Sequence, residues 1–329
     1  MPLGSNVTGG CEMDGRVLDY LYAITYAVIL IPGLIGNVLA LWVFYAYMKE
    51  TKRAVIFMIN LAMADLLQVL SLPLRIFYYL HKSWPFGRFV CMFCFYLKYV
   101  NMYASIFFLV CISVRRFIYL LYPFRHRQRR CDVYVSVAGW ILVCLSCLPF
   151  PLLRTGQETS GGEQRCFVDL PLLDIGFAAS VVTVTAAEIF GFVSPLAIVL
   201  FCTWRTVASL REPHAASHDL GEKKKALKMI LTCAAVFLIC FAPYHLSFPL
   251  DFLAKANKIA SCSQRRAILT LHPVALCLAS MNCCLDPVIY YFTTDEFRRR
   301  LSRQDLVDGA EMQIYDGKDF TDPCGCRAR

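Results

Sequence analysis

Residues 91–130 read CMFCFYLKYVNMYASIFFLVCISVRRFIYLLYPFRHRQRR, and this stretch decides the fold. From Phe89 to Val114 the chain carries a single charge, that of Lys98. A helix of this length crosses the roughly 30 Å of a bilayer's hydrocarbon core. The run ends in a cluster of arginines, which is typical of the cytoplasmic side of a membrane. We therefore predict a membrane-spanning helix whose arginine-rich end faces the cytoplasm.

Polar residues recur along this helix at Lys98, Asn101 and Ser105. Their spacing of three and four places them on one helical face. Lipid offers such a face no hydrogen-bond partners, so the face must look into a helix bundle or a watery cavity. We therefore expect a central helix that carries function.

The composition agrees with an integral membrane protein. Hydrophobic residues make up 58% of the 329 residues and charged residues 17%, with a mean hydropathy of +0.53. Apolar runs of spanning length predict an all-α membrane protein with a seven-transmembrane helix bundle over residues 20–292. An extracellular N-terminus, residues 1–19, precedes the bundle, and a short amphipathic helix and polar tail, residues 293–329, follow it. The predicted spans are residues 20–47, 54–80, 89–114, 133–153, 175–204, 229–250 and 267–292.

Basic residues predict the orientation. Of the 33 Lys and Arg residues, 22 lie in the loops after spans one, three and five or in the tail. This distribution predicts an outside N-terminus and a cytoplasmic C-terminus, and no nucleic-acid partner. The outer side then holds the glycosylation sequon at Asn6 and four cysteines, which allow three pairings that the sequence does not choose among. These cysteines are Cys11, Cys91, Cys166 and Cys262.

Four basic residues lie in the outer thirds of their spans or at the outer ends: Arg75, Lys98, Arg154 and Lys255. Unpaired cations at this depth are costly, so they should face a cavity and need anionic partners. One alternative is a structural ion pair between Lys98 and Glu188. The cations outnumber the nearby acids, however. This surplus favours a phosphate or carboxylate ligand, which arginine can bind with two parallel hydrogen bonds.

Aromatic residues lie at depths compatible with these cations, and small apolar residues follow at residues 178–182 in the fifth span. The aromatic side chains would supply hydrogen-bond donors and apolar walls. The small side chains would admit an acyl chain from the lipid. An amphiphile with an anionic head and one tail would fit both the surplus of cations and the small side chains that face the lipid. The predicted lining residues besides the cations are Tyr79, Tyr99, Tyr103, Phe167 and Tyr244.

A second group of oxygen-bearing side chains lies deeper, at Asp65, Asn101, Ser105, Asn282 and Asp286. Two neighbouring buried carboxylates repel each other unless a cation or a proton intervenes. Hard oxygen ligands suit a small hard cation. The alternative is a protonated, water-linked hydrogen-bond network. We expect no other cofactor.

Several short motifs stand in register with these spans. They are Gly36-Asn37, LAMAD at 61–65, Cys91, Arg116, Trp140, Pro195, CFAP at 240–243 and NCCLDPVIY at 282–290. Together they resemble the rhodopsin-like (class A) G-protein-coupled receptors over essentially the whole chain. ETKRAVIFMINLA at 50–62 and CFYLKYVNMYASI at 94–106 resemble, within the purinoceptor-like branch, the lysophosphatidylserine receptors.

The resemblance implies a plasma-membrane receptor rather than an enzyme. It implies disulfides Cys91–Cys166 and Cys11–Cys262, and sodium as the small cation. It also implies lysophosphatidylserine as the ligand, with an acid such as Asp251 or Asp169 for its ammonium group. A heterotrimeric G protein, of the Gs or the twelve/thirteen class, would be the partner.

Other functions remain as alternatives at this point. A nucleotide receptor or a lysophosphatidic acid receptor of the same branch would also need an anion site. A transporter or an intramembrane hydrolase is more remote. The sequence has no internal repeat and no HExxH or GxSxG motif, which such proteins often carry.

Two departures from the family pattern concern activation. Arg115 stands where an acidic residue usually precedes the arginine of span three. We expect Arg115 to repel Arg116 and so to raise basal signalling. Phe241 replaces the more usual Trp of span six. The residues expected to act in activation or G-protein contact are Arg115, Arg116, Phe241, Pro243, Pro287 and Tyr290, and Cys324 and Cys326 are candidate palmitoylation sites.

Overall fold

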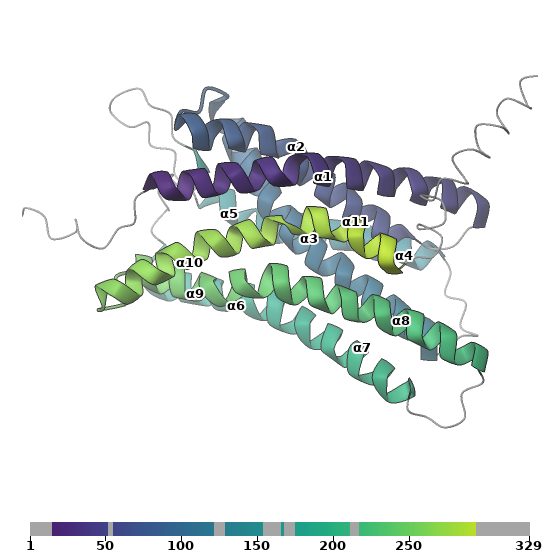
Figure 1. Ribbon diagram of the computed structural model, residues 1–329. Helices are drawn as coiled ribbons and strands as arrows, with labels where there is room; N and C mark the ends of the chain where they lie inside the picture. Colours follow the sequence, from purple (N-terminus) through teal and green to yellow (C-terminus); the bar gives the residue numbers. More distant parts are fainter. Residues whose placement is uncertain are drawn as a thin grey trace, which may run out of the picture.

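The computed structural model describes residues 15–51, 55–121, 129–153, 166–167, 175–210 and 217–293. Seven of its helical segments are long and apolar enough to cross a bilayer, and they run side by side along the long axis of the molecule (Figure 1). These described residues contain no strand. The predicted all-α seven-helix bundle is therefore confirmed. Several predicted features lie outside the described residues. They are the amphipathic helix after residue 293 and the residues Asn6, Cys11, Arg154, Asp169, Cys324 and Cys326.

The helices extend beyond the apolar runs at several ends, because a helix continues into the polar layer on either side of the hydrocarbon. Spans one to three are single helices, whereas spans four to seven are each built from more than one segment. The first three are α1 (Gly15–Thr51), α2 (Ile56–His81) and α3 (Gly87–Leu121). The others are α4 (Arg129–Cys147) with α5 (Pro149–Leu152); α6 (Phe177–Glu188), η2 (Ile189–Val193) and α7 (Ser194–Leu210); α8 (Ser217–Val236), η3 (Phe237–Phe241) and α9 (Ala242–Lys255); and α10 (Cys262–Ser280) with α11 (Asn282–Thr293).

Prolines explain two of the interruptions. A wide turn of π-helix, η2, stands just before Pro195, and a second, η3, stands just before Pro243. Proline has no backbone N–H to donate and its ring crowds the preceding turn, so the helix widens there. Both wide turns lie at the middle of their spans. They position the side chains of spans five and six that face the bundle interior.

The central position predicted for span three is confirmed. Helix α3 packs against α2, α4, α5, α7 and α8, and it lies inside the bundle in Figure 1. Asn101 and Ser105 are buried, whereas Lys98 at the outer end of the same stripe is partly exposed. The polar stripe of α3 therefore faces the interior.

A disulfide between Cys91 and Cys166 joins the loop before span five to the outer end of α3, with the two Cα atoms 5.8 Å apart. The backbone N–H of Cys166 donates to the Tyr78 hydroxyl at 3.1 Å, which also attaches this loop to α2. The implied Cys91–Cys166 pairing is thus confirmed. Cys262 is disulfide-bonded as well, but its expected partner Cys11 lies outside the described residues, so that pairing stays a prediction.

Span five is the least enclosed part of the bundle. Helix α6 has no buried residue, and Val182 is 68% exposed. Within the described residues α6 packs on α9. Because none of its residues is buried, α6 presents most of its surface outwards.

Candidate ligand site and buried carboxylate site

Arg75 of α2 is the most buried of the predicted outer cations, at 1% exposure. Its guanidinium donates to the carbonyl oxygen of Cys94 and, at 3.3 Å, to the Ser71 hydroxyl. It also lies over the ring of Phe167, 4.7 Å from the centroid. All of these partners are neutral. No carboxylate among the described residues pairs with Arg75.

Lys98 of α3 is also held by neutral groups. Its ammonium donates to the Tyr26 hydroxyl at 3.2 Å and lies 5.5 and 5.9 Å from the ring centroids of Tyr22 and Tyr26. The positive charge of Arg75 acts on it through space. We call Arg75 and Lys98 the outer cation cluster.

The alternative ion pair between Lys98 and Glu188 is not formed. Glu188 stands at the end of α6, and its carboxylate contacts Nδ1 of His245 at 3.1 and 3.2 Å. Burial of the His245 side chain makes that carboxylate its natural partner, since the imidazole has no access to water. Glu188 is thus engaged by His245 of span six, whereas Lys98 contacts Tyr26 of span one.

Lys255 differs from the outer cation cluster. Its ammonium pairs with Asp251 one turn earlier in α9 at 2.7 Å, and its side chain is 53% exposed. Asp251, expected to be free for a ligand ammonium, is thus engaged in the absence of a ligand. Arg154 cannot be placed, since it lies outside the described residues.

The predicted aromatic residues do gather beside the outer cation cluster. Tyr79 stacks on Phe167 with ring centroids 6.0 Å apart, and Tyr99 stacks on Phe150 at 4.0 Å. The hydroxyls of Tyr103 and Tyr244 are buried and have no hydrogen-bond partner. These two hydroxyls are therefore polar groups that a ligand or a water molecule would satisfy.

Deeper in the bundle, Asp65 of α2 and Asp286 of α11 are fully buried, and their carboxyl groups lie close together. Asn101 donates to Oδ1 of Asp65 at 3.0 Å, and Asn282 donates to the Ser105 hydroxyl at 2.9 Å. Oδ2 of Asp65 and both carboxyl oxygens of Asp286 accept no hydrogen bond. We call Asp65 and Asp286 the inner carboxylate cluster. All five predicted residues are brought together there, and the three unsatisfied oxygens fit a small cation or shared protons.

At the other end of α3, Arg115 does not simply repel its neighbour. Its guanidinium pairs with Asp132 of α4 at 3.2 Å, which compensates its charge. Arg116 instead contacts α8, where its Nε lies 2.9 Å from the sulfur of Met229. The hydroxyl of Thr203 in α7 donates to the backbone carbonyl of Val199 in the same helix.

The remaining activation residues lie inside the bundle. Phe241 is fully buried and contacts Phe237 edge to face. Tyr290 is also buried, and its hydroxyl donates to the carbonyl of Met58 at 3.4 Å. Tyr290 is thus enclosed in this structure, and its expected role in activation or G-protein contact stays a prediction. Its aromatic ring packs on Phe44, which encloses it between spans one and seven.

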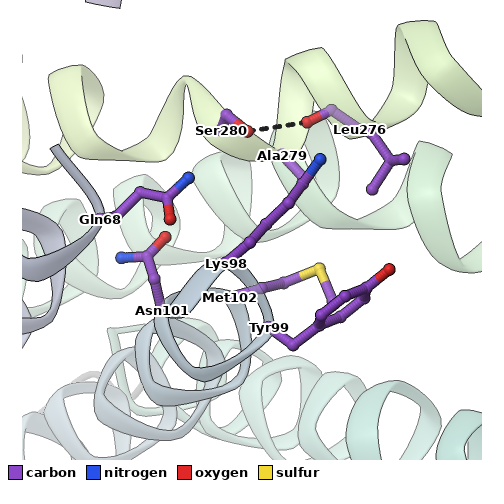
Figure 2. Close-up of a pocket in the computed structure, with 8 residues that line it drawn as sticks. All are labelled: Gln68, Lys98, Tyr99, Asn101, Met102, Leu276, Ala279 and Ser280. Carbon is purple, nitrogen blue, oxygen red and sulfur yellow. Dashed lines mark hydrogen bonds between the residues drawn. The ribbon is translucent and has the colours of Figure 1, made fainter. Parts of the chain in front are cut away.

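The sequence analysis missed three polar side chains of the site. Tyr22 and Tyr26 approach Lys98 from α1, and Gln68 of α2 lines a small cavity beside it (Figure 2). A signal was present for each. Tyr22 and Tyr26 stand four residues apart, on one face of α1, and Gln68 follows Asp65 by three residues in an otherwise apolar run.

This bundle, with its central polar helix and proline-widened spans five and six, is that of a seven-transmembrane receptor. The family model "7 transmembrane receptor (rhodopsin family)" matches residues 36–290, so the chain belongs to this family. It is a multi-pass membrane protein, and the family acts through a ligand and a heterotrimeric G protein and is not enzymatic.

Individual relatives show which branch of the receptor family the chain resembles. Human "Probable G-protein coupled receptor 174" is 70% identical over 304 residues, which cover 91% of this chain and 91% of the relative. The human protein provisionally called P2Y purinoceptor 10 is 49% identical over 308 residues, covering 92% and 90%. Chicken lysophosphatidic acid receptor 6 is 36% identical over 293 residues, covering 88% and 95%. The predicted purinoceptor-like branch is thereby confirmed.

Proposed function

We propose that this chain is a plasma-membrane receptor for an anionic lysophospholipid, and that the lipid is lysophosphatidylserine. One observation carries the proposal. Arg75 and Lys98 are two neighbouring cations that only neutral groups hold within the described part of the chain. Such cations are unfavourable inside a membrane protein unless an anion joins them. A phosphate or carboxylate would complete the outer cation cluster with charge-assisted hydrogen bonds.

The headgroup of lysophosphatidylserine matches the surroundings of this cluster. Its phosphate and carboxylate suit Arg75 and Lys98. The unsatisfied hydroxyls of Tyr103 and Tyr244 would donate to further oxygens. Its ammonium would be bound by Asp251, which now pairs with a half-exposed lysine that can turn to solvent.

The acyl chain has a route as well. Helix α6 has no buried residue, so its side chains are open to the lipid. Small side chains at Ala178 and Ala179 leave room beside the lipid. We expect the tail to enter between spans four and five. Chicken lysophosphatidic acid receptor 6, a relative of the chain, is by its name a receptor for a lysophospholipid.

A nucleotide is the second candidate, because another relative is named as a purinoceptor. A nucleotide is also anionic, and its phosphate chain would use the same cations. It would need more cations than Arg75 and Lys98, however, and it has no use for an opening towards lipid. The exposed face of α6 therefore favours the lipid.

Two further parts of the proposal concern the inner carboxylate cluster and signalling. We infer that the three unsatisfied oxygens of Asp65 and Asp286 bind a sodium ion. The alternative, a protonated and water-linked network, would use the same oxygens. For the partner we infer Gs or a G protein of the twelve/thirteen class, acting at a cytoplasmic face near Arg116.

G-protein activation in cells tests the ligand. Oleoyl lysophosphatidylserine, lysophosphatidic acid and ADP are titrated separately on the chain and on Arg75→Ala. We expect a response to lysophosphatidylserine, with its EC50 raised about 30-fold by Arg75→Ala, the size expected for losing a hydrogen-bonded charge. Arg88→Ala is the matched control, because Arg88 is exposed at the start of α3. A response to ADP alone would contradict the lipid proposal.

A further inference from the structure

Lys98 has an incomplete set of partners. An ammonium carries three N–H donors, and the Tyr26 hydroxyl takes one of them at 3.2 Å. The faces of Tyr22 and Tyr26 attract the charge but accept no conventional hydrogen bond. Two donors of Lys98 are therefore left for other groups.

The cavity beside Lys98 offers what is missing. It is lined on its polar side by Gln68, Lys98, Asn101 and Ser280, and it has about 10 Å³ of free space, about the room that one water molecule needs (Figure 2). Gln68 is 1% exposed, and its Oε1 has no hydrogen-bond partner among the residues that the structure describes. An unsatisfied acceptor and unsatisfied donors thus line one small cavity.

Span one completes the arrangement. The Tyr26 hydroxyl lies beside Ser280, another residue of the cavity wall. Tyr26 is fully buried, and its ring is 5.9 Å from that of Tyr22 and 6.0 Å from that of Tyr79. Packing against these two rings fixes the position of the Tyr26 hydroxyl, so the contact with Lys98 does not depend on a mobile side chain.

We propose that Tyr26 and Gln68 are positioning residues that form a resting seat for the Lys98 ammonium, completed by one water molecule in the cavity. The water accepts from Lys98 and donates to Oε1 of Gln68. This inference rests on the proposed function, in which Lys98 binds the anionic headgroup. The seat satisfies Lys98 while no ligand is bound, and the arriving anion must draw the ammonium away from it.

The direction of the effect follows from this competition. A group that stabilises only the ligand-free form lowers the apparent affinity of the ligand. Weakening the seat should therefore strengthen binding. A hydrogen bond to a charged group changes an equilibrium by about tenfold, and the aromatic faces remain in a Phe variant, so we expect a shift of about threefold to tenfold.

The test measures G-protein activation by oleoyl lysophosphatidylserine at matched surface expression. Tyr26→Phe removes the hydroxyl and keeps the ring, and Gln68→Met removes the acceptor at similar volume. Each is expected to lower the EC50 by about threefold to tenfold. Tyr20→Phe makes the same chemical change on the same helix at a residue that is 59% exposed, and it should leave the EC50 unchanged.

A Lys98→Met background shows whether the two residues act through Lys98. In that background the shifts from Tyr26→Phe and Gln68→Met should vanish, because variants that act on one group are not additive. An unchanged or raised EC50 in both variants, or the same shifts without Lys98, would overturn the seat. If Lys98→Met alone leaves the response intact, the proposed anion site fails. If it weakens the response while both seat variants have no effect, only the seat fails. Gln68→Met decides the matter if Tyr26→Phe does not reach the surface.

Discussion

The outer cation cluster and the inner carboxylate cluster are opposite in charge but alike in their surroundings. Arg75 and Lys98 are held by carbonyl, hydroxyl and aromatic groups. Asp65 receives a hydrogen bond from an amide, and the oxygens of Asp286 receive none. Within the described residues neither cluster contains its own counter-charge. In the proposed function, each cluster binds an ion of the opposite sign that comes from outside the chain.

Other charged residues of the molecule do have a partner of opposite charge. Arg115 pairs with Asp132, Lys255 with Asp251, and Lys82 with Asp19 at 2.5 Å. Buried charges usually have partners, because an isolated charge loses its hydration without compensation. The two clusters depart from this rule, and the central helix α3 reaches both: Lys98 belongs to the outer cation cluster, and Asn101 donates to Asp65 of the inner one. In the proposed function, one turn of α3 would therefore connect the ligand site with the inner carboxylate cluster.

The strongest way to break the comparison is to reverse the charge of the outer cation cluster. Lys98→Glu should raise the EC50 for lysophosphatidylserine about 100-fold, because the new carboxylate repels an anion in a weakly screened site. Lys98→Gln should raise it about tenfold, since it removes the attraction without adding repulsion. Arg88→Glu on the same helix controls for the change of net charge. Equal effects of Glu and Gln would show that Lys98 acts through its shape and not its charge.

The inner carboxylate cluster should respond to a cation in the medium. Agonist EC50 is compared in sodium and in choline medium of equal ionic strength. We expect sodium to raise the EC50 about fivefold in the unmodified chain, and Asp65→Asn to abolish this difference, because the amide carries no charge for the ion. Asp19→Asn removes a carboxylate that pairs with Lys82 elsewhere, and it should retain the difference. Persistence of the sodium effect in Asp65→Asn would favour the protonated network.

The two clusters also show how far the sequence leads. The long uncharged runs predict every span, and the spacing of Lys98, Asn101 and Ser105 places that stripe inside the bundle. The inner carboxylate cluster was predicted from the same patterns, since Asp65 and Asp286 are carboxylates inside otherwise apolar spans. The partners of the charged residues could not be predicted in this way. Glu188, which directly precedes the wide turn η2, binds His245 instead of Lys98, and helix periodicity predicts neither the turn nor the pairing.

The contribution of α1 could be predicted only in part. Tyr22 and Tyr26 share one face of the helix, but only the packing of α1 against α2 and α10 brings Tyr26 to Lys98. Likewise the prediction that Arg115 repels Arg116 did not take account of Asp132 in the next span, which pairs with Arg115. Charges that meet across two spans depend on helix rotation, and a single sequence leaves that rotation undetermined.

The end of α3 that carries Arg115 and Arg116 sharpens the comparison, because there a charge is compensated inside the chain. Arg115→Asp should lower basal G-protein activation about threefold, because it gives Arg116 a neighbouring carboxylate that stabilises the inactive form. Asp132→Asn breaks the same Arg115–Asp132 ion pair without adding an acid beside Arg116. We expect that variant to change basal activity less than twofold, in line with a partly exposed pair. If both variants lower basal activity equally, the ion pair and not the charge beside Arg116 controls it.

The smallest effect is expected where a partly buried polar group is hydrogen-bonded to neutral partners. The indole N–H of Trp140 donates to Oδ1 of Asn60 at 2.8 Å, and the Asn60 amide donates to the carbonyl of Ile56 at 2.7 Å. Trp140→Phe should lower the free energy of unfolding by about 1 kcal/mol and Tm by about 2 °C. The EC50 should change less than twofold. Trp204→Phe, at a residue that is 63% exposed, is the control for ring size.

The Trp140→Phe variant separates two roles of polar groups inside the bundle, one in stability and one in ligand binding. Trp140 donates to Asn60, and Asn60 donates to the backbone, so these groups need no partner from outside the chain. Loss of these hydrogen bonds should therefore change only the stability. The outer cation and inner carboxylate clusters leave a net charge unsatisfied, so their loss should appear in binding. A large EC50 shift in Trp140→Phe with an unchanged Tm would reverse this assignment. It would mean that ligand affinity depends on the packing of α2 against α4 as much as on the charges that α2 and α3 carry.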